Sequence, residues 1–399
     1  MSAPTIEPHE SDEDFSLVLG GPLFQIFRRA YLSGSALELL HRRMTFITAI
    51  SWFPLLALSI WEGHVWGGGI SLPFLHDVDA HARLLIALPL LVAAELFVHQ
   101  RMRNVVRQFF ERGLIPDSDR SRFDRAATSA SRLRNSVVAE LLLVAFVYGV
   151  GVLFLWRKNA ELDVSSWYNP TSDGSLHPSL AGWWFALVSL PLFQFLLFRW
   201  YYRLFIWARF LWQVSRIKLD LVPTHPDRSA GLGFLSNVTF AFTPLLLAQG
   251  TLLAGMIANR IFYTGAHLTQ FKVDIAGVVA VTVAIVLAPL LVFSPQLDRA
   301  KRAGGREYGR LAQRYVREFD RKWLRGGAAP DELLIGSSDI QSLADMGNSY
   351  DVIREMTWLP FNTKTVLQLG VTAIAPVLPL TLTMVPLDQL LDRLLKIIF

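Results

Sequence analysis

The chain has 399 residues, of which 52% are hydrophobic and only 18% charged, and its mean hydropathy of +0.36 is too high for a water-soluble fold of this size. The absence of cysteine excludes disulfides, thiolate metal sites and cysteine nucleophiles. Lys and Arg (38) outnumber Asp and Glu (33), but the position of the cations explains this excess without nucleic acid binding. The composition predicts a multi-pass membrane protein.

The N-terminal segment, residues 1–43, is expected to lie in the cytoplasm. Residues 1–14 are acidic and lack the basic region, apolar stretch and cleavage site of a signal peptide. Two short amphipathic helices are predicted between Pro22 and Arg43, the second with a capping-box spacing from Ser35 to Glu38.

Seven apolar segments predict an all-α bundle of transmembrane helices. The last one, residues 366–387, lies in a terminal segment 363–399 and is interrupted by three prolines, so it either crosses the membrane or forms a re-entrant hairpin. The tail after Pro386 has leucines at helical spacing and should lie along an interface. The other six segments, within a transmembrane domain 44–297, lie near residues 45–61, 84–98, 137–156, 182–198, 238–258 and 275–297.

The distribution of cations predicts the orientation. Of the 38 Lys and Arg residues, 31 lie in alternate segments, residues 1–43, 100–135, 199–237 and 298–364. Short cationic loops are retained on the cytoplasmic side. The N-terminus is therefore expected inside, and seven spans would leave the C-terminus outside.

Two of these cationic segments are long enough to form a helical cytoplasmic layer. The insert 101–135 reads as two basic helices separated at Gly113 to Asp117. Residues 298–362 open with a helix whose aromatic and leucine positions recur every three or four residues, and shorter helices follow a G-G-A-A-P linker. We expect the two segments to pack on one another.

Ionisable side chains near the inner ends of the spans form the first candidate site, because such groups need a partner or a purpose within a membrane. Glu95 and Glu140 lie six residues from Arg101 and Arg134 respectively, so both are expected at the same depth. Either they tie helices together through ion pairs, or they form an ion or proton site. The predicted intramembrane polar cluster comprises Glu95, Glu140, His99, Gln194, Arg199 and Arg203.

The second candidate is the loop T-H-P-D-R-S-A-G-L-G-F from Thr224 to Phe234, between a basic helix and an apolar span. One reading is a rigid turn in which Asp227 caps the next helix and His225 bonds a neighbouring loop. The other is an anion or lipid-phosphate site made by Arg228 and free backbone N–H groups. A J-domain is disfavoured because a span begins close by. The loop candidates are His225, Asp227, Arg228, Gly231 and Gly233.

The outer loop H-D-V-D-A-H is a third candidate, for a divalent metal ion. His76, Asp77, Asp79 and His81 carry suitable ligand atoms, although their spacing matches no standard site. The alternative is that Asp79 caps the helix that begins at Ala80. We predict no other metal ligands and no bound cofactor.

Three segments resemble those of a family of uncharacterised bacterial multi-pass inner-membrane proteins: H-P-D-R-S-A-G-L-G-F, R-L-L-I-A-L-P-L-L-V-A-A-E around Glu95, and G-S-S-D-I-Q-S-L-A-D-M-G-N-S-Y around Asp339. The resemblance implies a location in the bacterial inner membrane. It implies no activity and no catalytic or binding residues.

Three functions are compatible with these features. The first is a channel or transporter for ions or small solutes, using the Glu95 cluster and Gln249. The second is a sensor, scaffold or assembly factor whose residues 298–362 bind a cytosolic partner. The third is recognition of anionic lipid by the loop at Arg228. No hydrolase, P-loop or zincin motif is present, so enzymatic activity has no support, and a homo-oligomer remains open.

Overall fold

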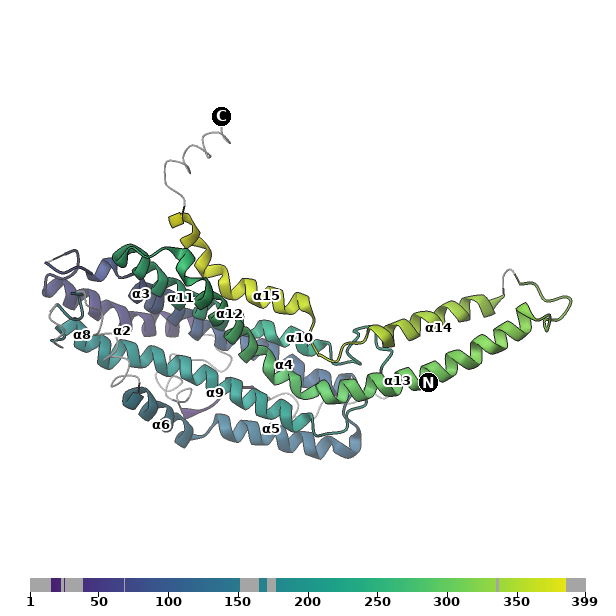
Figure 1. Ribbon diagram of the computed structural model, residues 1–399. Coiled ribbons are helices and arrows are strands. Elements are labelled where there is room, and N and C mark those ends of the chain that lie inside the picture. The colour runs from purple at the N-terminus through teal and green to yellow at the C-terminus, as the bar shows by residue number, and fades with distance from the viewer. Residues whose placement is uncertain are drawn as a thin grey trace.

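Helices form nearly all the regular structure of the computed structural model, which describes residues 16–22, 25, 39–67, 69–150, 165–170, 177–334 and 337–384. Within these ranges there are two isolated β-bridges and no strand. The predicted all-α bundle is confirmed (Figure 1). The acidic tail, most of the predicted helices before Leu39, the end of the third predicted span and the tail after Pro386 lie outside the described residues.

Six helical rods are long and apolar enough to cross a membrane, as expected of a multi-pass membrane protein. Most are built from consecutive pieces of different helix type. The rods are α2 (Leu40–Trp61); α3 (Val78–His81), η2 (Ala82–Ala87) and α4 (Leu88–Glu111); α8 (Leu180–Trp184), η5 (Phe185–Ser189) and α9 (Leu190–Val214); α10 (Phe234–Thr239), η6 (Phe240–Phe242) and α11 (Thr243–Thr264); η7 (Leu268–Phe271), α12 (Lys272–Leu287), η8 (Ala288–Phe293), α13 (Ser294–Phe319) and η9 (Asp320–Leu324); and α15 (Thr363–Ile374) with η10 (Ala375–Met384).

A proline marks the start of a new piece at six of these junctions. Proline has no N–H to donate, so the first turn of a helix tolerates it, whereas a helix interior loses a hydrogen bond. The six are Pro89 in α4, Pro191 in α9, Pro244 in α11, Pro289 in η8, Pro295 in α13 and Pro376 in η10.

Whether the chain has six or seven membrane-spanning helices depends on the third predicted span. Helix α5 (Arg120–Arg134), preceded by η3 (Asp117–Asp119), meets α6 (Val137–Phe146) at a bend of 47°, and the two pass the span criteria only as a pair. The last predicted span, in contrast, is one continuous rod as far as Met384 and is itself among the six candidates. The described part of this segment is therefore not a hairpin.

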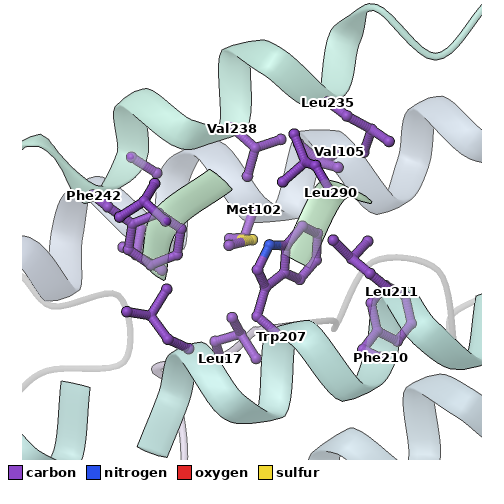
Figure 2. Packing of buried hydrophobic residues seen from close by; sticks show 14 of the residues in the cluster. Leu17, Met102, Val105, Trp207, Phe210, Leu211, Leu235, Val238, Phe242 and Leu290 are labelled. Atoms are coloured by element: carbon purple, nitrogen blue, oxygen red, sulfur yellow. The ribbon is translucent and has the colours of Figure 1, made fainter. Parts of the chain in front are cut away.

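Besides the 57-residue rod that ends in η9, two rods are much longer than the hydrocarbon layer is thick. Val78–Glu111 and Leu180–Val214 contain 34 and 35 residues, or about 50 Å of helix against a hydrocarbon thickness of about 30 Å. The C-terminal halves of these rods carry the Arg residues of α4 and α9, and we call this end of the bundle the basic end. There, Trp207 of α9 packs against Met102 of α4, Val238 of α10 and Leu290 of η8 (Figure 2). The basic end thus has a close-packed core like that of a soluble helical protein.

Helices α13 and α14 (Ser338–Glu355) form a hairpin that projects from the basic end (Figure 1). Tyr315 donates to the Asp339 carbonyl at 3.0 Å, and the Trp323 indole donates to the Asp339 carboxylate at 3.0 Å. The expected packing of 298–362 on 101–135 is not the main arrangement: α14 packs on α13, while α5 packs on α9. We refer to α13, η9, the connecting residues and α14 as the hairpin arm.

The last rod is fixed to the bundle at a close contact between α11 and α15. A Cβ atom at Gly250 would lie 2.1 Å from the Ala373 carbonyl oxygen, so only glycine permits this approach. We predict that Gly250→Val separates the helices and lowers the free energy of unfolding by about 1–3 kcal/mol, the usual cost of overpacking. Thermal unfolding of the detergent-solubilised protein measures the change.

Gly277→Val on α12 is the matched control, because nothing lies within 4 Å of a Cβ atom at that position. Equal midpoints for the two variants would contradict the packing of α15 on α11.

Candidate functional site: a buried cluster of arginine and glutamate

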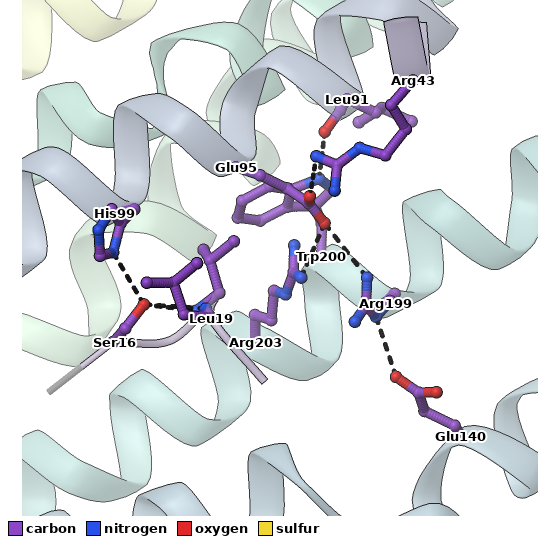
Figure 3. Close-up of polar contacts among 11 residues, drawn as sticks. Ser16, Leu19, Arg43, Leu91, Glu95, His99, Glu140, Arg199, Trp200 and Arg203 are labelled. Carbon is purple, nitrogen blue, oxygen red and sulfur yellow. Dashed lines mark hydrogen bonds and ion pairs between the residues drawn. The ribbon is translucent and has the colours of Figure 1, made fainter. Parts of the chain in front are cut away.

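Glu95 on α4 is 5% exposed and accepts hydrogen bonds from three arginines (Figure 3). Its Oε1 accepts from Arg199 Nη1 at 3.2 Å and from Arg203 Nη2 at 2.8 Å. Its Oε2 accepts from Arg43 Nη2. Both carboxylate oxygens are thus occupied by guanidinium groups that are themselves buried.

The three arginines come from two helices that both pack on α4. Arg199 and Arg203 lie four residues apart on α9 and therefore share one face. Arg43 lies in the first turn of α2. The Trp200 indole donates to the Leu91 carbonyl at 2.8 Å, and its ring lies 4.6 Å below the Arg203 guanidinium. The cluster fixes the axial positions of α2, α4 and α9 relative to one another.

Glu140 extends the cluster to α6. Arg199 Nε lies 3.2 Å from Glu140 Oε1, so one guanidinium bridges two carboxylates. Ser136 positions Glu140 in the first turn of α6, because its hydroxyl accepts the Ala139 N–H at 3.2 Å and starts the helix. The expectation that Glu95 and Glu140 lie within reach of Arg199 agrees with this geometry.

His99 and Gln194, which the sequence placed in the same group, lie outside the ion-pair network. His99 Nδ1 is 3.0 Å from the Ser16 hydroxyl (Figure 3). Gln194 is 5% exposed, and its buried Oε1 has no hydrogen-bond partner among the described residues. Proximity in sequence to Glu95 and Arg199 does not bring either side chain to the carboxylates.

Arg43 is the functional-site residue that the sequence analysis missed. It lies directly before the first apolar segment and was assigned to the N-terminal amphipathic helices, yet it is only 1% exposed. One signal in the sequence pointed to a third donor: a buried Glu95 that faces two arginines on one helix still has a second carboxylate oxygen that needs a hydrogen bond. The sequence could not show that α2 packs beside α4.

The loop from His225 to Gly233 is held in shape by the carboxylate of one of its own residues, Asp227. Asp227 accepts backbone N–H bonds from Ser229 at 2.9 Å, Gly231 at 3.1 Å and Gly233 at 2.8 Å. Burial opposes ionisation of Asp227, yet these three donors hold its pKa below the ordinary value. His225 Nδ1 accepts the Asp227 N–H at 3.2 Å and so bonds within the loop.

This arrangement corrects the predicted anion site, because the N–H groups assigned to an anion are used by Asp227. The glycines fit this geometry: Gly231 has φ +96°, and a Cβ atom at Gly233 would lie 2.9 Å from the Asp227 carboxylate. Arg228 pairs with Glu355 at 2.9 Å, and its carbonyl accepts the Thr357 N–H at 2.9 Å. The loop therefore connects the bundle to the base of the hairpin arm.

The four predicted metal ligands at the opposite end do not converge. Asp77 caps α3, accepting the Ala80 N–H at 3.0 Å, and also accepts from Asn259 and the Trp167 indole, both at 2.8 Å. The cap is thus Asp77 rather than Asp79.

The other three candidates are engaged elsewhere. Asp79 pairs with Arg83 at 2.7 Å, and His81 Nδ1 accepts the Trp52 indole N–H at 3.1 Å. The backbone carbonyl of His76 accepts from Tyr263. Across the described residues, no group of three or more His, Asp or Glu side chains is arranged to hold a metal ion. These side chains join helix ends instead.

The Glu95 cluster has the chemistry of a helix clamp rather than of an ion site. An ion that bound to Glu95 would have to displace a guanidinium from a buried carboxylate, which leaves a buried charge without its partner. No protein-family model, curated protein or solved structure matches the chain.

We predict that Glu95→Gln destabilises the protein by about 3–5 kcal/mol, because three buried guanidinium groups lose their shared counter-charge. The measurement is the midpoint of thermal unfolding in detergent. Glu307→Gln, at an exposed position on α13, is the control and should leave the midpoint unchanged. A loss in Glu95→Gln no larger than that of the control would refute the clamp.

We predict that Asp227→Asn destabilises the loop by about 1–3 kcal/mol at pH 7, since an amide offers one acceptor oxygen in place of two. A lowered pKa stabilises the folded state fully above the unfolded-state value of about 3.9 and progressively less as the pH falls toward the folded-state value. The wild type should therefore lose stability below about pH 4, and Asp227→Asn should lose less over that window.

Unfolding midpoints measured from pH 3 to pH 7 test this difference. Asp331→Asn, an exposed aspartate near the tip of the hairpin arm, should follow the wild-type curve. Parallel curves for the wild type and Asp227→Asn would show that the carboxylate is not held by the loop.

Proposed function

We propose that the chain is a non-transporting multi-pass protein of the bacterial inner membrane that holds a cytosolic partner with its hairpin arm. The location rests on the resemblance of its three segments to the inner-membrane family and on the concentration of Lys and Arg at one end. The same concentration supports a cytoplasmic basic end. The single observation that carries the proposal is the projection of the arm away from the bundle (Figure 1).

The tip of the arm exposes aliphatic side chains that contact little else. Leu324 is 71% exposed and Leu333 is 78% exposed, and Leu334 and Ile340 are exposed as well. Lys322 fixes this end of the arm, because it pairs with Glu332 and, at 2.8 Å, with Asp339. Exposed apolar side chains on a rigid, pre-ordered support are typical of protein interaction sites.

The charges of the arm indicate the kind of partner. The stretch from Ser294 to Leu324 contains nine Lys or Arg and four Asp or Glu, while α14 contains one Arg and four Asp or Glu. Arg321 and Arg325 flank the aliphatic tip. We infer a folded cytosolic protein with a small apolar pocket and acidic side chains around it.

The geometry gives less support to a conduit. Transport through the Glu95 cluster needs a carboxylate that binds and releases an ion, whereas Glu95 is engaged by Arg43, Arg199 and Arg203. Gln249, the other polar residue considered for a path, donates to the Tyr201 hydroxyl at 2.7 Å. The contacts of Glu95 and of Gln249 thus both join helices.

We predict that a photo-crosslinking residue at Leu333 captures one discrete cytosolic protein in cells. Val222, 50% exposed at the basic end, is the matched position away from the tip and should not capture it. Adding Leu324→Ser should reduce the Leu333 product at least tenfold, because it removes an apolar contact from the same surface. The measurement is the yield of the crosslinked band after immunoprecipitation.

Three outcomes would contradict the proposal. One is equal capture from Leu333 and Val222, and another is a Leu333 product made only of two copies of this chain. The third is flux of a common ion through reconstituted protein that Glu95→Gln abolishes, since this would assign the cluster to transport.

A further inference from the structure

A cavity lies where the end of α9 meets the start of α13. It has a volume of about 970 Å³. Three cations line it, Arg216, Lys218 and Arg299, together with one acid, Asp220. All three cations are exposed, and none forms an ion pair with a carboxylate in the described part of the chain. The cavity is therefore open and carries an excess of positive charge.

The loop that carries two of these cations is held in place. Gln296 Nε2 donates to the Ser215 carbonyl at 2.6 Å and to the Ile217 carbonyl at 2.8 Å. The Arg216 guanidinium lies 5.0 Å from the centre of the Trp212 ring. These contacts fix the backbone around Arg216 and Lys218 before any ligand binds, which lowers the entropic cost of binding.

Two neighbouring cavities continue this one, and Trp212 lines all three. An apolar cavity of about 630 Å³ is lined by residues from Tyr201 to Trp212 of α9 and from Ile285 to Val292 of α12 and η8. A basic cavity of about 400 Å³ adds Arg122 and Arg125 of α5. The apolar cavity, which we call the apolar groove, thus joins the first cavity, which we call the cationic pocket, at Trp212.

The depth of these cavities matches the edge of a bilayer. Counting from Lys272, at the start of α12, a hydrocarbon thickness of about 30 Å ends near Val292 at 1.5 Å per residue. The apolar cavity lies on the hydrocarbon side of Val292, and Arg299 lies seven residues beyond it, at headgroup depth. Tryptophan is typical of this boundary.

We propose that this surface binds an anionic phospholipid, with its phosphate in the pocket of Arg216, Lys218 and Arg299 and one acyl chain along the apolar groove. Guanidinium and ammonium groups recognise phosphate oxygens, and basic pockets between transmembrane helices hold anionic headgroups. Trp212 lies at the level of the ester groups, between the chain and the headgroup. The lipid site is distinct from the Asp227 loop, where Arg228 is paired with Glu355.

The test is lipid binding to the delipidated full-length protein, followed by native mass spectrometry. The probes are dioleoylphosphatidylglycerol, dioleoylphosphatidylcholine with the same chains, and glycerol 3-phosphate, which has the phosphate without chains. The wild type should bind phosphatidylglycerol saturably, phosphatidylcholine at least tenfold more weakly, and glycerol 3-phosphate not measurably. The contributions of the acyl chains and of the headgroup charge are thereby tested separately.

The triple variant Arg216→Gln, Lys218→Gln, Arg299→Gln should bind phosphatidylglycerol about 100-fold more weakly, at about fivefold for each cation. The control is Arg306→Gln, Arg310→Gln, Arg317→Gln, which removes the same charge from exposed positions on α13 and should change binding less than threefold. Circular dichroism confirms that both variants are folded.

A second pair of variants tests the acyl-chain groove. Ala208→Phe fills the apolar cavity and should weaken phosphatidylglycerol binding about tenfold, whereas Ala280→Phe, in a separate groove between α12 and α15, should not. The proposal is overturned if the triple variant binds like the wild type, if both triple variants lose binding equally, or if glycerol 3-phosphate binds as tightly as the lipid.

Discussion

The structure depends on one charged contact, the carboxylate of Glu95 shared by three buried guanidinium groups. Arg43 on α2 and Arg199 and Arg203 on α9 can be buried only because Glu95 offsets their charge, and Glu95 can be buried only because they donate to both of its oxygens. Removing Glu95 takes a carboxylate away from all three guanidinium groups, of which Arg199 retains Glu140. This mutual dependence fixes the axial position of three helices, which apolar contacts alone allow to slide.

Beyond the cluster, toward the basic end, the bundle continues as a close-packed helical core. Helices α4 and α9 continue for several turns past Glu95 and Arg203 and enclose Trp207 with residues from α10 and η8. Because the clamp sets the register of these helices, it also sets which side chains meet around Trp207. The loop at Asp227 then passes this fixed geometry to the base of the arm through Arg228.

Hydropathy and charge in the sequence predicted the helical class, the location of the long helices and the approach of Arg199 and Arg203 to Glu95, because one-dimensional spacing sets depth along a helix. The sequence could not assign Arg43 to the cluster, because lateral packing decides which helix lies beside α4. For the Asp227 loop, the predicted rigid turn held by Asp227 agrees with the structure, and the predicted anion site was wrong: free N–H groups and a carboxylate in one short segment satisfy each other before any ligand can. The contact of Trp167 with Asp77, in which the fully buried indole donates to the carboxylate, likewise joins segments 90 residues apart and has no local sequence pattern.

The proposed lipid pocket and partner surface lie at opposite ends of the helix formed by α13 and η9. Arg299 is in the second turn of α13 and Leu324 ends η9, so 25 residues, or about 38 Å of helix, separate them. At physiological ionic strength the field of a charged membrane decays over about 8 Å. The tip of an arm that continues the long axis of the bundle (Figure 1) is therefore beyond the reach of headgroup charge. Its choice of partner is then set by Leu324, Leu333 and their charged neighbours, while the lipid acts where the rod leaves the bundle.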